Sequence, residues 1–190
     1  MRLLAGLLLA FGIAGGLGLW LTLVTIDRPL GIAGLRSGPW EGDPGAGSLN
    51  ADPYSRAMIA RRGEAPLPSS DGIALIARTD SSGIELEGRC DYLLEGEVPG
   101  ARLWTLAVYD ADGFPIANAA DRYGLGSTAM VRPFGEATTV TLAPSVRAGN
   151  WLPTPERGPF LLALRLYETA GAFVTDPPPA LPSLRRLGCR

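Results

Sequence analysis

The stretch from Gly149 to Tyr167, GNWLPTPERGPFLLALRLY, decides the fold of this chain. It begins with a Gly-Asn turn and Trp151, passes three prolines, and ends in an alternating apolar run over residues 159–167. Four large apolar side chains share one face of that run, at Phe160, Leu162, Leu164 and Leu166. Each contributes roughly 1.5–3 kcal/mol when it is fully buried. The run therefore predicts a core strand, and Trp151 with the prolines predicts the corner that leads into it.

The opposite face of the predicted strand carries Arg165 and Tyr167. A covered arginine in the middle of a strand needs a carboxylate or carbonyl partner, because an unpaired buried charge is very costly. Asp110 and Asp121 are candidates for that partner. Two interpretations stay open: Arg165 ties loops to the sheet, or it contacts an anionic ligand.

Alternation of apolar and polar residues recurs in five further segments, which indicates half-buried strands. They cover residues 73–78, 84–87, 89–98, 103–110 and 138–143. The apolar face of the third segment contains Cys90, Tyr92, Leu94 and Val98. Trp104 lies on the apolar face of the fourth segment, which is followed by the tight-turn signal Asp112-Gly113. These patterns predict a mainly β, antiparallel sandwich.

One short helix is predicted over residues 52–63. Asp52 is a favourable N-cap, Pro53 suits the first helical position, and Gly63 fits the position just past the end. This helix precedes the first predicted strand of the sandwich.

The N-terminal segment contains no charged residue from Leu3 to Ile26. As a helix it would span about 36 Å, enough to cross a hydrocarbon core of about 30 Å. A cleaved signal peptide is the alternative, but its apolar region normally covers about 7–15 residues. We therefore predict a single transmembrane helix, with residues 3–26 in the membrane. The predicted domains are an anchor over residues 1–28, a Gly/Pro-rich tether over 29–50 and a β-sandwich domain over 51–190.

The two cysteines of the chain, Cys90 and Cys189, are expected to form a disulfide. Cys90 lies on the apolar face of its strand, whereas the position of Cys189 is unusual for a buried core thiol. The bond would close a loop of about 100 residues, worth up to ~4.7 kcal/mol in the chain-entropy model. Because such bonds belong in oxidising compartments, we expect the domain on the outer, periplasm-like side of the membrane.

The composition argues against several classes of function. The net charge is −2, which does not suit a nucleic-acid binder with a basic surface. Histidine is absent, which removes Ser-His-Asp and Cys-His catalysis, His-ligated metals and a histidine pH switch. We therefore predict no nucleic-acid partner, no cofactor and no metal site.

Several blocks of residues resemble the DUF1214 family of bacterial proteins. They are Asp52-Pro53-Tyr54 with Arg56-Ala57, Trp104-Thr105-Leu106 with Tyr109-Asp110, Arg122-Tyr123, Gly149-Asn150-Trp151-Leu152-Pro153 and Leu164-Arg165-Leu166-Tyr167. The resemblance runs from about Asp52 to the end of the sequence, and the last two blocks are the most specific. It implies a jelly-roll-like antiparallel β-sandwich and no established catalytic residues. Family members often follow a second domain, DUF1254, and this chain resembles the short, membrane-anchored form that stands without it. With the predicted anchor, this implies a single-pass protein of the bacterial inner membrane whose C-terminal domain is periplasmic.

Three classes of function remain open. The first is a non-enzymatic envelope domain that binds a small molecule or glycan, or that helps to assemble envelope components. Its candidate contact residues are Trp104, Asp110, Asn150, Trp151, Arg165 and Tyr167. The second is a structural partner subunit of a membrane complex, and the third is a hydrolase or lyase that uses the carboxylates of Asp110 and Asp121. We predict the first class and assign no catalytic residue.

Overall fold

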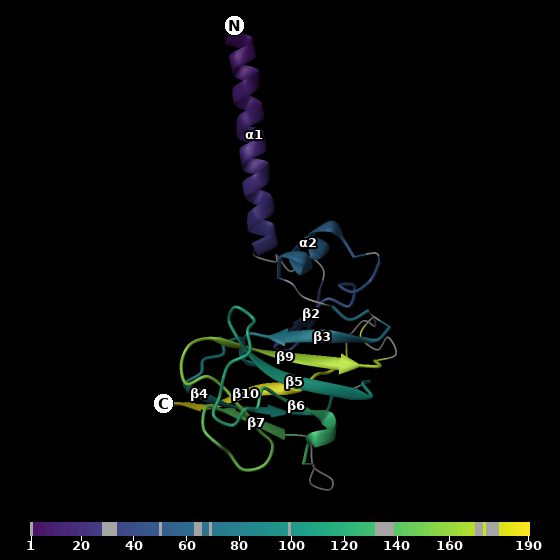
Figure 1. Ribbon diagram of the computed structural model, residues 1–190, viewed down its shortest axis with the longest axis vertical. Helices are drawn as coiled ribbons and strands as arrows, with labels where there is room; N and C mark the ends of the chain where they lie inside the picture. The colour runs from purple at the N-terminus through teal and green to yellow at the C-terminus, as the bar shows by residue number, and fades with distance from the viewer. Residues whose placement is uncertain are drawn as a thin grey trace. The chain divides into compact units, whose positions relative to one another are not determined.

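The structure is a computed structural model that describes residues 2–27, 34–49, 51–62, 66–68, 70–98, 100–131, 139–169, 173 and 179–190. The chain divides into two units (Figure 1). The first takes residues 1–33 and 49–65, and the second takes residues 34–48 and 66–190. The helices lie in the first unit and the sheets in the second.

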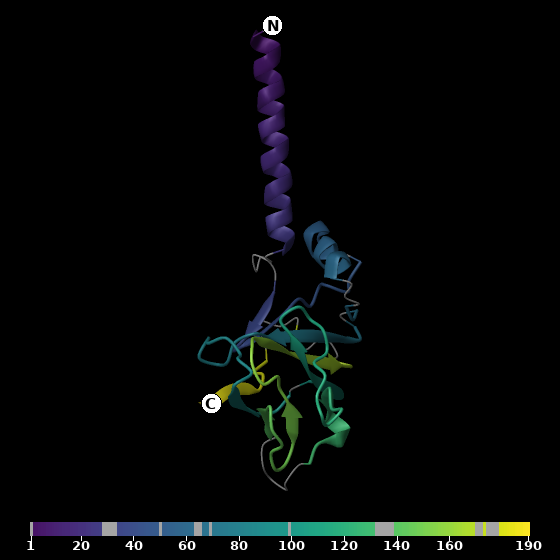
Figure 2. The ribbon, with the colours of Figure 1, turned by 60° about the vertical axis from the view of Figure 1, so that its left-hand side comes forward.

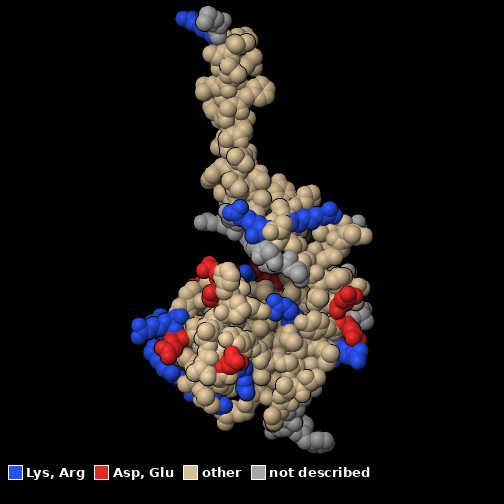
Figure 3. Space-filling view, in the orientation of Figure 1, with Lys and Arg blue, Asp and Glu red and all other residues tan. Residues whose placement is uncertain are grey.

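The first unit contains α1 (Arg2–Asp27) and α2 (Pro53–Arg62). Figure 3 shows an uncharged surface along most of α1, and its large apolar side chains are exposed. The segment Arg2–Ile26 is long and apolar enough to cross a membrane, a property that anchors and signal sequences share. The hydroxyls of Thr22 and Thr25 donate to backbone carbonyls four residues earlier, at 2.9 and 2.8 Å. Both hydroxyls are therefore satisfied within the helix, as an apolar environment requires.

Helix α2 begins as the sequence predicts. The Oδ1 atom of Asp52 accepts hydrogen bonds from the backbone N–H groups of Tyr54 and Ser55, at 2.9 and 3.1 Å, which is an N-cap. Hydrogen bonds from the hydroxyl and the backbone N–H of Ser55 lower the pKa of Asp52. Gly63, which was predicted to lie just past the end of this helix, is outside the described residues.

The larger sheet of the second unit has six strands in the order β1-β2-β3-β9-β5-β6, and every neighbouring pair is antiparallel. The strands are β1 (Leu35–Ser37), β2 (Trp40–Gly42), β3 (Gly72–Ala77), β9 (Phe160–Tyr167), β5 (Leu103–Asp110) and β6 (Gly124–Gly126). Strand β9 is central, because it pairs along its length with β5 and along most of it with β3. A 3-10 turn, η1 (Ser127–Ala129), follows β6.

The smaller sheet has four strands in the order β10-β4-β7-β8. They are β10 (Ser183–Cys189), β4 (Cys90–Glu95), β7 (Thr139–Ala143) and β8 (Trp151–Pro153). The pairing of β7 with β8 is parallel and the other two pairings are antiparallel. Figures 1 and 2 show the two sheets as separate layers. The second unit is therefore a mainly β, sandwich-like domain.

The hydrophobic core lies between the two sheets. The predicted inward residues of β9, β5, β4 and β7 belong to it, namely Phe160, Leu162, Leu164, Leu166, Trp104, Leu106, Val108, Cys90, Tyr92, Leu94, Val140 and Leu142. The ring of Tyr92 meets that of Phe160 edge-on, with centroids 5.8 Å apart. The predicted inward faces of these strands are thus confirmed, and Thr138, expected in the same strand as Val140, lies outside the described residues.

The predicted disulfide is confirmed. Cys90, the first residue of β4, is bonded to Cys189, the last residue of β10. Because disulfides persist in oxidising compartments, this bond and the apolar helix together indicate an envelope or secreted location.

The opening stretch of the sequence divides between the two sheets, so the predicted corner at Trp151 is wrong. Trp151–Pro153 is an edge strand of the smaller sheet, and Phe160–Tyr167 is the central strand of the larger one. The connection is the segment 154–159. Pro153 is compatible with its strand, because an edge strand tolerates a residue without an N–H group.

Four further strands were not predicted from the sequence, and one predicted strand is absent. Strand β6 is one of the four, since it follows the predicted segment 103–110 and precedes the predicted segment 138–143. Strands β1 and β2 fall within residues 29–50, which were expected to be a tether, and β10 falls in the proline-rich tail. Trp40 explains the first difference: it is fully buried, and its indole N–H donates to the Pro182 carbonyl at 2.8 Å. The predicted strand over residues 84–87 contains only isolated bridges, at Glu85 and Glu87.

Candidate functional site

The two tryptophans expected to contact a ligand are buried. Trp104 is 6% exposed and packs in the core, and Trp151 is 7% exposed on the outer face of the smaller sheet. The indole N–H of Trp151 donates to the Ala143 carbonyl at 2.9 Å. Arg122 lies over its ring, 5.8 Å from the centroid, and donates to its backbone carbonyl at 2.9 Å. Burial in the core explains Trp104, and these contacts explain Trp151, so both rings have a packing role.

Asp110 and Asn150 are engaged by nearby backbone groups. The Oδ1 atom of Asp110 accepts from the N–H groups of Asp112 and Phe114, at 3.0 and 2.8 Å, which fixes the predicted turn. The amide of Asn150 exchanges two 2.8 Å hydrogen bonds with the backbone of Val131 and donates to the Thr139 carbonyl at 3.0 Å. Both side chains thus hold loops in place.

Arg165 and Tyr167 lie half-buried on the outer face of the larger sheet. Arg165 donates to the hydroxyl of Tyr109 at 3.0 Å, and its guanidinium lies over that ring, 5.5 Å from the centroid. The two side chains meet across the Ala107–Ala163 pair, whose small size leaves room for them. The prediction that Asp110 or Asp121 is the partner of Arg165 is therefore wrong. The hydroxyl of Tyr109 occupies that position instead.

A separate groove of about 840 Å³ opens at one end of the sandwich. Its lining residues all lie next to strand ends, and they are Glu87, Arg89, Pro144, Ser145, Glu156, Arg157 and Arg190. Strands β4 and β9 begin at this end, and β7, β8 and β10 finish there. The fold thus brings four loop segments, far apart in sequence, to one site.

Backbone contacts fix one wall of the groove. Gly88 donates to the Gly158 carbonyl at 2.9 Å, and the Oε1 atom of Glu87 accepts from the N–H of Gly158 at 2.8 Å. A Cβ atom at Gly88 would come within 2.5 Å of the Pro155 carbonyl oxygen, so this close approach requires glycine. These contacts position Glu156 and Arg157 beside the segment 87–89, which carries Arg89.

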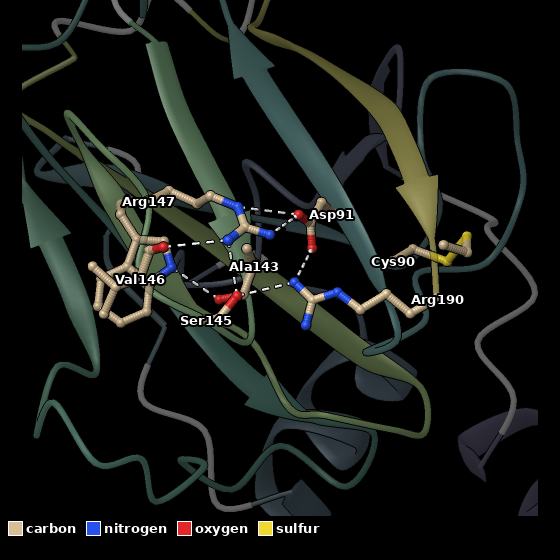
Figure 4. Close-up of polar contacts among 9 residues, drawn as sticks. Cys90, Asp91, Ala143, Ser145, Val146, Arg147 and Arg190 are labelled. Atoms are coloured by element: carbon tan, nitrogen blue, oxygen red, sulfur yellow. Dashed lines mark hydrogen bonds and ion pairs between the residues drawn. A yellow bond between two sulfur atoms is a disulfide. The ribbon is translucent and has the colours of Figure 1, made fainter.

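A cluster of polar side chains orients Arg190 at the groove (Figure 4). Asp91 accepts two hydrogen bonds from Arg147, at 2.5 and 3.2 Å, and its other oxygen lies 3.6 Å from Arg190. The hydroxyl of Ser145 lies 2.9 Å from a guanidinium nitrogen of both arginines. Arg190 is therefore oriented by an acid and a hydroxyl, yet its side chain stays 56% exposed.

Three charged side chains of the groove are free in the structure. Arg89, Glu156 and Arg157 are exposed, and within the described part of the chain no hydrogen bond or ion pair engages their side chains. With Arg190, the groove presents three guanidinium groups, and Glu156 is the free carboxylate beside them. Guanidinium groups bind carboxylate and phosphate through paired N–H donors. The arrangement can therefore hold an anionic, hydroxyl-bearing ligand.

No pattern in the sequence indicated this groove directly. Its arginines are scattered over residues 89–190 and are adjacent only after both sheets have formed. One signal was available: Cys90 and Cys189 are expected to pair, so the neighbours Arg89, Asp91 and Arg190 had to lie close together. Within the described residues no group of three His, Cys, Asp or Glu side chains could hold a metal ion.

Similarity to one solved structure supports this fold. The chain resembles the solved VPA0106 protein from Vibrio parahaemolyticus, with a TM-score of 0.61 and 22% identity over 73% of this chain and 36% of that one. An uncharacterised protein from Burkholderia cenocepacia gives a TM-score of 0.44 and 16% identity over 90% of this chain and 40% of that one. This chain thus spans well under half the length of either protein. No curated protein matches it.

A family model described as "Protein of unknown function (DUF1214)" matches residues 71–171. The match covers every strand from β3 to β9 and more than half of the 190 residues. The chain therefore belongs to the DUF1214 family.

Proposed function

We propose that this protein is a membrane-anchored envelope domain that binds an acidic, hydroxyl-bearing ligand such as an acidic glycan. The observation that carries the proposal is the groove in which Arg89 and Arg157 are free and Arg190 is held in place. We assign the domain a binding or assembly role without catalysis.

The chemistry of the lining supports an acidic ligand with hydroxyl groups. Carboxylates of the ligand would pair with the guanidinium groups, and ligand hydroxyls would donate to Glu156. The lining residues that the structure describes include no aromatic ring on which a neutral sugar could stack. Charge recognition would therefore dominate, and binding would weaken as salt rises.

The proposed location follows from the first unit and the disulfide. We propose that residues 1–28 anchor the protein in the bacterial inner membrane and that the sheet-containing unit, residues 34–48 and 66–190, lies in the periplasm. The apolar helix and the Cys90–Cys189 bond support this arrangement. We also propose jelly-roll connectivity for the sandwich, which many lectin-type modules share.

The test uses the full chain in nanodiscs, with trigalacturonic acid as the probe and its methyl ester as the neutral match. Isothermal titration calorimetry should show binding of the acid and little binding of the ester. The double variant R89Q/R157Q should lose about 100-fold or more in affinity, since it removes two charge-assisted hydrogen bonds that contribute roughly 1.5–3 kcal/mol each. Each variant is checked for an unchanged Tm.

Two arginines outside the groove serve as controls. R185Q alters an exposed arginine of β10, and R165Q alters the arginine on the outer face of the larger sheet. Both should bind the acid like the wild type. Loss of binding in R165Q alone would move the site to that face, and equal binding of acid and ester would overturn the proposal. No binding of either probe would favour a structural partner subunit.

A further inference from the structure

The end of β10 is weakly held by packing. Leu184 is fully buried, and Arg186 forms an ion pair with the buried Asp80 at 3.2 Å, so the strand is anchored up to that point. A β-bulge follows between Arg186 and Gly188. Beyond it, residues 187–190 are all exposed. Segments with few buried contacts open locally at low cost, so this segment depends on other restraints.

The disulfide is the strongest of those restraints. Cys189 pairs with Cys90 in the ladder and is bonded to it, and the next residue donates from its backbone N–H to the Arg89 carbonyl at 3.0 Å. Figure 4 shows the arginine side chain turning back from this bond toward Asp91 and Ser145. The place of Arg190 in the groove therefore depends on the covalent link one residue before it.

We propose that the Cys90–Cys189 disulfide is a redox control of the groove. Reduction frees residues 187–190 beyond the bulge, Arg190 leaves Ser145 and Asp91, and the groove loses its third guanidinium group. The body of β10 stays in the sheet, because Leu184 and the Asp80–Arg186 pair do not depend on the bond. This inference rests on the proposed function of the groove.

The reductant is a dithiol, such as the active site of a thiol oxidoreductase. Its thiolate attacks the sulfur of Cys189, which lies on the exposed residue of the pair, and Cys90 leaves as a thiolate that takes up a proton. The second thiol of the dithiol then attacks the mixed disulfide and releases Cys189 as a thiol. Two electrons pass to the protein disulfide, and the dithiol becomes a disulfide.

The test compares oxidised and dithiothreitol-reduced full chain in nanodiscs, with trigalacturonic acid as the probe. Reduction should weaken binding about tenfold, the loss expected for one charge-assisted contact. Oxidised R190Q should be weakened to the same extent, and its reduction should have no further effect. Hydrogen exchange should accelerate at residues 188–190 on reduction and stay slow at residues 184–186.

A variant without cysteines, C90A/C189A, controls for direct effects of the reductant. It should bind like the reduced wild type, with or without dithiothreitol. Equal affinity of oxidised and reduced wild type would overturn the redox control and leave the binding function intact. If reduction weakens R190Q as much as the wild type, the effect does not pass through Arg190. Absence of binding by the oxidised protein would overturn both proposals.

Discussion

The indole N–H of Trp40 donates to the carbonyl of Pro182 across 142 residues of sequence. The bond ties β2 of the larger sheet to the residue that precedes β10 of the smaller one, and Trp40 is fully buried. This hydrogen bond therefore links the two layers within the apolar interior.

Replacing Trp40 with Phe should destabilise the domain. The W40F variant leaves the Pro182 carbonyl without its donor, and an unsatisfied buried acceptor costs about 1–3 kcal/mol. The smaller ring adds a cavity term. Urea unfolding followed by circular dichroism measures the change. W20F in the exposed surface of α1 is the control and should match the wild type.

Breaking the Asp80–Arg186 pair should cost more than breaking an exposed pair. Asp80 is 2% exposed and lies 3.2 Å from Arg186. The D80N variant removes the negative charge but keeps a side-chain oxygen that can accept from the backbone N–H groups of Ser82 and Ile84. We expect a loss of about 1–3 kcal/mol, because the arginine stays partly buried without its partner.

The matched control for D80N is E41Q, which breaks an ion pair between Glu41 and Arg36 at 2.9 Å on the surface. Its cost should stay within about 0.5 kcal/mol, as for most surface substitutions. Equal losses in D80N and E41Q, measured by urea unfolding, would contradict the role given to the buried pair.

Alkaline pH should destabilise the domain through Tyr92. Burial raises the pKa of this phenol, whose oxygen accepts a hydrogen bond from the Glu87 N–H at 2.8 Å. A raised native pKa means that the contribution to stability is complete below the unfolded value of about 10 and declines as pH rises beyond it. Unfolding free energies measured between about pH 8 and 12 should fall more steeply in the wild type than in Y92F. Parallel curves would contradict the prediction.

Asn150 should act on stability and leave ligand binding unchanged. N150A removes three hydrogen bonds to the backbone of Val131 and Thr139, so we expect a loss of about 1–3 kcal/mol in unfolding free energy. Calorimetry with trigalacturonic acid, at a temperature where the variant is folded, should give wild-type affinity. A stable N150A that no longer binds the acid would restore Asn150 as a contact residue.

Local patterns predicted the long strands well. In β9 the alternation of Phe160, Leu162 and Leu164 correctly predicted the buried face, because successive side chains of a strand point to opposite faces. The same argument holds for Trp104 and Val108 in β5. The Asp52 cap of α2 was predictable because it depends on residues two and three positions away.

Short strands and the groove were not predictable in that way. Strands β1, β2, β6 and β8 have three residues each, too few for a period to be recognised. Strand β10 carries polar residues and pairs with β4, some 90 residues away, through contacts that no local pattern reports. Arg165 illustrates the same limit: its charge suggested an acidic partner, whereas the register of β5 and β9 supplies Tyr109.

The close approach of Gly88 to Pro155 also bears on how ligand preference can change during evolution. The segment 154–159 joins the two sheets and carries Glu156 and Arg157, while the strands on either side are fixed by their own ladders. Insertions or deletions within it can therefore reshape the groove without disturbing the layers, provided that the glycine contact is kept. Among relatives of this chain, we expect ligand choice to vary with the length of that segment.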